Sequence, residues 1–182
     1  MRVEYKARIL APAAIAICDV SDVKVVAGNL PAQTTPTKYY IIFGIGTQNY
    51  TCGADGAVAQ LYDISCFYKS EPGRQLTDTY IGEHYFVTNP VTGTGISPKW
   101  DMTKALDDPN AFVIEARSAG IPAPTGPSDV DWLYLTNVQG ALATDIYRTD
   151  TRGGQPPSSC TPGSEPIAVG YSTVYWLTGG FL

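Results

Sequence analysis

The 182-residue sequence has only one histidine, His84, and lacks the common motifs of catalysis and nucleotide binding. It contains no phosphate loop G-x-x-x-x-G-K-[ST], no zinc motif H-E-x-x-H and no nucleophile motif G-x-S-x-G. Residues 44–49 begin like a dinucleotide fingerprint, but Asn49 replaces the third glycine and no helical pattern follows. These absences argue against an NAD-dependent dehydrogenase, and the sequence predicts no cofactor.

Charge is also scarce, at 16% of the residues, with 12 Lys and Arg against 17 Asp and Glu and a net charge of −5. Three of the basic residues, Arg2, Lys6 and Arg8, lie at the very start, so the rest of the chain is more acidic still. An acidic chain without a basic stripe repels phosphate groups, so we expect neither nucleic acid nor a membrane surface as a partner. No run of about 18 apolar residues is present, which excludes a membrane-spanning helix.

Residues 1–17 have two interpretations. The basic residues up to Arg8 precede an apolar stretch in which Ala14 and Ala16 are spaced like a signal-peptide cleavage site. Glu4 in the basic region and Pro12 in the apolar stretch favour an uncleaved first strand over a degenerate secretory signal. We expect residues 18–182 to form a single domain, for which this length is sufficient.

Four cysteines, Cys18, Cys52, Cys66 and Cys160, predict two structural disulfides in an oxidising compartment, with three pairings open. No C-x-x-C spacing occurs, and with one histidine the sequence predicts no metal site. Four buried thiols are the alternative for a chain that is not secreted. In a secreted chain, the sequon at Asn49 would be a glycosylation site.

Short β-type segments separated by clusters of Gly, Pro, Asp and Asn predict an all-β domain. The expected strands are 23–26, 39–45, 48–52, 57–62, 80–87, 112–116, 132–136, 142–147 and 169–177. Hairpin turns are expected at Asp55-Gly56 and at 137–140, and one short helix at 102–108. Together with long Pro- and Gly-rich loops at 119–129 and 150–166, this pattern predicts a single antiparallel β-sandwich or a closed β-barrel.

Catalytic candidates are few. His84 could act as a general base only if a nucleophile and a carboxylate came from elsewhere in the fold, and a structural role beside Phe86 is the favoured interpretation. A glycosidase mechanism needs two carboxylates facing one cleft. The available acids are Asp63, Glu83, Asp129, Asp131, Asp145 and Asp150. With 17 acidic residues in the chain, no pair among them is diagnostic.

Aromatic residues are abundant, with 12 Tyr, 5 Phe and 3 Trp, and Tyr and Trp suit both sugar faces and protein interfaces. Trp100 follows Pro98-Lys99 at a loop-like position, so we expect it to be exposed. The candidate ligand-binding residues are Trp100, Tyr85, Arg148, Asp150 and Arg152. One of the two arginines is expected to brace the long loop through a carboxylate.

Several stretches carry a family resemblance. They are 46–52 (GTQNYTC), 56–66 (GAVAQLYDISC), 82–86 (GEHYF), Trp100, 130–133 (VDWL), 146–160 (IYRTDTRGGQPPSSC) and 171–176 (YSTVYW). In these the chain resembles a fungal family of small secreted proteins of uncharacterised function, often labelled malate dehydrogenase, with bacterial relatives. The resemblance implies secretion and the four-cysteine frame but no known activity, and the missing nucleotide fingerprint conflicts with the dehydrogenase label.

Two functional hypotheses follow. The first is a non-catalytic binding module, for example a lectin-like one, that binds a glycan or another protein surface through aromatic-rich loops. The second is a small hydrolase or isomerase that uses His84 in a pocket bordered by Arg148 and Arg152. Its carboxylate would come from Asp129, Asp131, Asp145 or Asp150. A structural or effector protein that acts through a protein interface is a third option.

Overall fold

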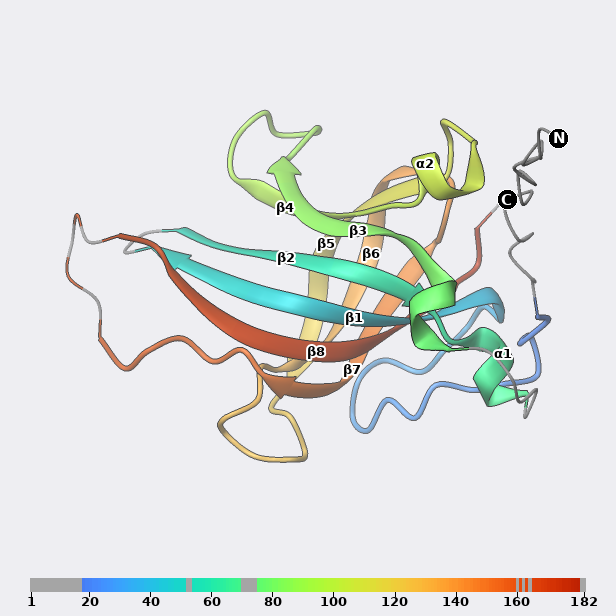
Figure 1. The fold of residues 1–182 in the computed structure, drawn as a ribbon, viewed down its shortest axis with the longest axis horizontal. Helices are drawn as coiled ribbons and strands as arrows, with labels where there is room; N and C mark the ends of the chain where they lie inside the picture. Colours follow the sequence, from blue (N-terminus) through green and yellow to red (C-terminus); the bar gives the residue numbers. More distant parts are fainter. Residues whose placement is uncertain are drawn as a thin grey trace, which may run out of the picture.

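In the computed structural model, eight antiparallel strands close into a barrel (Figure 1). The structure describes residues 18–51, 54–69, 75–159, 161, 163 and 165–180. The strands are β1 (Thr37–Thr51), β2 (Ala54–Asp63), β3 (Tyr80–Thr88), β4 (Ile96–Asp101), β5 (Phe112–Ile121), β6 (Trp132–Gly140), β7 (Asp145–Gly153) and β8 (Ile167–Thr178). Each strand pairs with the next in sequence, and β8 returns to pair with β1. The all-β prediction is confirmed, and the barrel is selected over the sandwich.

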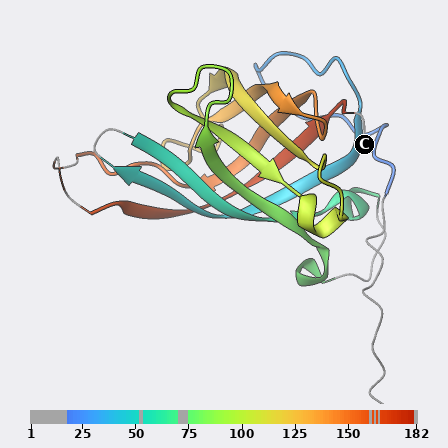
Figure 2. The same ribbon diagram turned by 90° about the horizontal axis from the view of Figure 1, so that it is seen from above.

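The two ends of the barrel differ. At one end, α1 (Ser65–Tyr68) and η1 (Leu76–Thr79) connect β2 to β3, and α2 (Thr103–Leu106) connects β4 to β5. At the other, which we call the loop end, lie the connections 89–95 and 122–131 and the residues 154–159 that follow β7 (Figure 2). The helix expected within 102–108 is confirmed as α2. None of the helices in the described residues has the length and apolarity needed to cross a membrane.

Several local predictions are wrong. The segment 23–26 is extended but pairs with no strand, while β4, which was not expected, contains Pro98. The expected strands 39–45 and 48–52 are one continuous strand, β1. Asp55 and Gly56 pair with β1 within the ladder and do not form its turn. Residues 137–140 likewise continue β6, and the connection to β7 follows at 141–144.

Inward-facing apolar side chains fill the middle of the barrel. Among them, Trp100, Tyr175, Ile146 and Leu61 are 0% or 1% exposed. Burying each side chain of this size stabilises the fold by roughly 1.5–3 kcal/mol. Gly44 on β1 leaves room for the Tyr175 ring, because a Cβ there would lie 2.7 Å from it. The middle of the barrel is therefore closed by packing.

An extended segment, residues 18–36, covers the outer face of β1, β7 and β8 (Figure 1). Val20 and Leu30 are buried against a second apolar cluster that includes Ile41, Tyr147 and Trp176. A disulfide between Cys18 and Cys66 fixes the start of this segment beside α1. Its backbone is satisfied in part by side chains, since the amide of Val25 donates to Gln33 Oε1 at 3.1 Å.

The Cys18–Cys66 bridge confirms one of the two expected disulfides and fixes its pairing. Cys52 and Cys160 lie outside the described residues, as do residues 1–17, for which a strand or a signal was considered. A second disulfide stays a prediction.

The Cys18–Cys66 bridge should contribute strongly to stability, because it joins residues 48 positions apart. A loop of that size predicts a loss of about 4 kcal/mol when the cross-link is removed. We expect the double variant Cys18→Ser, Cys66→Ser to melt roughly 10 °C lower than the natural chain, measured by circular dichroism. An unchanged melting temperature would show that the segment 18–36 holds its place without the bridge.

Candidate functional site

The candidate site residues from the sequence lie in three separate places. His84 and Arg148 face the barrel interior, Tyr85 lies on its outer surface, and Asp150 and Arg152 are exposed near the loop end. Asn49 lies on β1, where its side chain accepts a hydrogen bond from Thr47 at 3.0 Å. Its glycosylation stays a prediction.

His84 is held rigidly inside the barrel. Its ring stacks on Trp100 with 4.4 Å between ring centres, and Nδ1 donates to the carbonyl of Lys99 at 2.9 Å. Burial lowers the pKa of His84 to about 4, with the nearby charge of Arg148 acting in the same direction. The imidazole is therefore neutral at neutral pH, and its surroundings are those of a packed side chain.

The expectation that Trp100 is exposed is wrong, because only 1% of its surface reaches solvent. The Pro98-Lys99 stretch that resembled a loop belongs to β4, and Trp100 faces inward from it. Its indole nitrogen is buried without a hydrogen-bond partner among the described residues.

Tyr85 belongs to a polar cluster outside the barrel. Its hydroxyl donates to Asp101 at 2.7 Å, and the ammonium of Lys99 lies 2.7 Å from the same carboxylate. These interactions, with two hydrogen bonds from Thr103, hold the pKa of Asp101 far below its usual value despite partial burial. This cluster borders a hollow of about 470 Å³ between β3 and α2, the largest we describe. The carboxylate of Asp101, the acid of this cluster, is already paired.

None of the four acids proposed to assist His84 contacts it in the described structure. Asp145 accepts from Tyr134 at 2.9 Å, and Asp150 accepts from Thr149 at 2.8 Å. Asp129 accepts from Thr125 and from the Gly153 amide, and these bonds lower its pKa. The geometry brings no catalytic pair together around the histidine.

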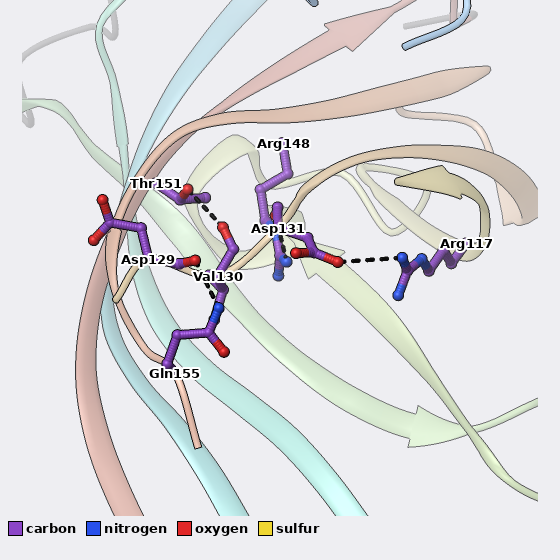
Figure 3. Close-up of polar contacts among 7 residues, drawn as sticks. All are labelled: Arg117, Asp129, Val130, Asp131, Arg148, Thr151 and Gln155. Atoms are coloured by element: carbon purple, nitrogen blue, oxygen red, sulfur yellow. Dashed lines mark hydrogen bonds and ion pairs between the residues drawn. The ribbon is translucent and has the colours of Figure 1, made fainter. Parts of the chain in front are cut away.

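The acids of the β5–β6 connection belong instead to a clamp at the loop end (Figure 3). Side chains from β7 and from the residues just after it donate hydrogen bonds to the backbone carbonyls of 129–131. Thr151 donates to the Val130 carbonyl at 2.7 Å, and Gln155 to the Asp129 carbonyl at 2.7 Å. Arg148 holds the Asp131 carbonyl with two bonds, from Nε at 3.1 Å and Nη2 at 2.8 Å.

The expected arginine brace is present, but its partner is a carbonyl. Arg148 supplies it, whereas Arg152 donates to the carbonyl of its neighbour Thr151 at 2.7 Å and reaches Thr125 only at 3.5 Å. Neither arginine forms an ion pair with Asp150 in the described residues. Gly154, with a φ of +86°, lets the chain pass close to Gln48 and Val130, where a Cβ would crowd both.

Beside this clamp the barrel interior opens in two adjoining cavities, which together we call the mouth. The first, of about 380 Å³, is lined by apolar and polar side chains that include Gln48, Phe86, Glu115, Arg117, Leu133 and Leu135. The second, of about 230 Å³, shares Gln48 and Arg117 and adds Tyr50, Val130, Asp131, Arg148 and Gln155. Mouths of β-barrels are common positions for ligand sites.

Two side chains of the mouth are polar, buried and unsatisfied. Glu115 is 0% exposed, and neither carboxyl oxygen has a hydrogen-bond partner among the described residues. Burial, reinforced by the charge of Asp145, raises the pKa of Glu115 well above its usual value. The amide of Ile146 offsets this only in part, because its geometry falls short of a hydrogen bond. The Nε2 group of Gln48 is also unpartnered. Orphaned polar groups of this kind are rare and costly in native proteins.

Metal chemistry has no support in the described residues, where no three His, Cys, Asp or Glu side chains converge as a cation site would require.

A comparison with known protein families finds a match for the chain. Residues 31–179 match the sequence profile of DUF3455, described as a protein of unknown function. The chain belongs to the DUF3455 family. No curated protein and no solved structure matches it. The matched range contains all eight strands and every residue of the mouth, so the DUF3455 region is the complete barrel.

Sequence reasoning missed Gln48, Glu115 and Arg117. A signal existed for Glu115, which is the only charged residue in the apolar run 112–116 and alternates with Val113 onto the inner face. No local pattern marks Gln48 or Arg117, because their meeting depends on which strands the barrel brings together.

The buried acid predicts a dependence of stability on pH. Because the pKa of Glu115 is higher in the folded chain than its ordinary 4.5, the folded state retains a proton that the unfolded state releases as pH rises. The natural chain should therefore lose stability as pH rises from the ordinary pKa to the raised one, by as much as about 1.4 kcal/mol per pH unit. We expect Glu115→Gln to gain in melting temperature relative to the natural chain between pH 5 and pH 8.

The matched control is Glu83→Gln, which changes an exposed carboxyl on β3. Its melting temperature should follow that of the natural chain across this range. A constant difference between Glu115→Gln and the natural chain would mean that the acid is already ionised when folded.

Proposed function

We propose that this DUF3455 barrel is a non-catalytic binding protein that takes a small molecule into the mouth. One observation carries the proposal: the unsatisfied polar groups of Gln48 and Glu115 face a cavity whose other walls are largely apolar, with Asn89, Ser97 and Arg117 as the polar exceptions. A ligand that accepts hydrogen bonds there would relieve the cost of burying these groups.

The shape and chemistry of the mouth support a small amphipathic ligand. Phe86, Leu133 and Leu135 offer apolar surface for a ring or a short chain. Gln48 lies between the two cavities and lines both of them. Few, well-placed polar groups in an apolar pocket are the usual composition of small-molecule sites.

This proposal keeps the binding-module hypothesis but moves the site. A lectin-like module that uses aromatic loops would present an exposed ring, and Trp100, the leading candidate, is sealed inside the barrel. The hydrolase or isomerase alternative needs an acid at His84, and the described structure brings none there.

We also propose that the protein is secreted. The Cys18–Cys66 disulfide supports this, because structural disulfides form and persist in oxidising compartments.

Ligand binding can be tested with small aromatic probes. We expect 2-naphthamide or 2-naphthoate to bind at about millimolar affinity or tighter, as ligands of this size can. The measurement is a two-dimensional amide NMR titration, in which the Gln48 side-chain amide and the backbone of β5 and β6 at the mouth should shift. Methyl β-glucoside serves as the sugar probe.

A blocking variant and its control make the test specific. Leu133→Trp fills the first cavity and should abolish the shifts. Val58→Trp should preserve them, because Val58 lies on the outer face of β2 and is 53% exposed. Binding by neither naphthalene probe, or shifts that survive Leu133→Trp, would overturn the proposal. Binding by the glucoside alone would do the same and favour the lectin-like hypothesis.

A further inference from the structure

Arg148 is a partly buried cation that forms no ion pair among the described residues. The ion pairs of the described residues join Lys69 to Asp22, Lys99 to Asp101 and Arg117 to Asp131, and none of them includes Arg148. Burial lowers the pKa of Arg148 from its ordinary value, but an arginine of this kind still carries its charge. A charge that is partly withdrawn from water without a directly bonded counter-ion is unfavourable, and an anion bound to it would be favoured.

The groups near Arg148 supply little free negative charge. The carboxylate of Asp131 acts on Arg148, but it is paired with Arg117 at 3.4 Å, and the charge of Arg117 acts in the opposite direction. His84 is neutral, and burial raises the pKa of both Tyr171 and Tyr175, which keeps these phenols protonated. The raised pKa of Glu115 likewise favours its neutral form. The second cavity is therefore lined by two arginines and one carboxylate, which leaves an excess of positive charge.

The guanidinium also has unused donors in a defined geometry. Nε and Nη2 each donate one bond to the Asp131 carbonyl, which occupies one edge of the group. The remaining N–H groups, on Nη1 and the second position of Nη2, have no partner in the described structure, and Arg148 lines the second cavity. Two parallel N–H groups on one edge form the fork that binds a carboxylate bidentately.

We infer that the ligand of the mouth is a small organic acid, bound with its carboxylate on the free edge of Arg148 and its apolar body against Phe86 and Leu133. The inference rests on the proposed function and specifies its ligand class. Gln48 lies where the two cavities meet, so its free Nε2 donor would reach the acid near the carboxylate. The orientation of the acid follows from the residues that line the two cavities, since the first cavity supplies apolar surface and the second supplies the Arg148 cation.

The test compares 2-naphthoate with 2-naphthamide, which have the same shape and differ in charge. Isothermal titration calorimetry on the natural chain at pH 7 should show the acid binding about tenfold more tightly than the amide, as a charge-assisted bidentate bond predicts. Arg148→Met, which keeps the side-chain length without the charge, should bring the two affinities within about twofold of each other.

Arg152→Met is the matched control, because Arg152 is exposed at the loop end and lines neither cavity. It should preserve the preference for the acid. Equal affinities for the two probes in the natural chain, or a preference that persists in a folded Arg148→Met variant, would overturn the inference and leave the proposed function standing. If neither probe binds, both the inference and the proposed function are overturned. If Arg148→Met does not fold, the comparison of the two probes on the natural chain still tests the inference.

Discussion

The pairing of β1 with β8 is the constraint on which the rest of this structure depends. It joins the first and last strands along Thr37–Tyr50 and Thr178–Ile167, and so converts a meander of hairpins into a closed ring. A closed ring has no exposed strand edge, and it has an inside. Only because the seam closes do side chains from β1, β5 and β7 face one another across the mouth.

The clamp at the loop end links architecture to chemistry. The stretches 130–133 and 146–160, which both carry the family resemblance, contact each other there through hydrogen bonds to the carbonyls of Val130 and Asp131. A third bond goes to the carbonyl of Asp129, just before the first stretch. The same contact turns one edge of the Arg148 guanidinium toward the protein and leaves the other edge toward the cavity. A single arginine thus stabilises the connection between β5 and β6 and presents a cation to the interior.

Most strands could be predicted from the sequence because apolar and polar residues alternate along a half-buried strand. It failed where the same pattern has another cause. Residues 23–26 alternate because Val23 and Val25 pack on the outside of the barrel, without a partner strand. The strand β4 was hidden by Pro98, which is tolerated because the β4–β5 ladder begins only at Lys99 and no pairing on that side needs its missing N–H.

The candidate site could be predicted from the sequence far less well than the fold. Arg148 was recognised as a candidate from its motif, but the loop acid expected beside it does not pair with it. The residues that share the mouth with it, Gln48 on β1 and Glu115 and Arg117 on β5, come from strands far from β7 in sequence. Their proximity follows from the order and register of the strands, which single-sequence periodicity does not specify.

The seam between β1 and β8 also has a consequence for how the chain reaches this shape. Hairpins such as β3–β4 join neighbours in sequence and can form early, whereas the seam links positions separated by more than a hundred residues, which makes its closure intrinsically slow. On the ribosome, β1 has no lasting partner on one side until β8 has been synthesised. In that interval the residues of 18–36 and of β1 that later form the outer apolar cluster remain accessible to water and to other chains, so the newly made protein is most vulnerable to aggregation just before its final strand emerges.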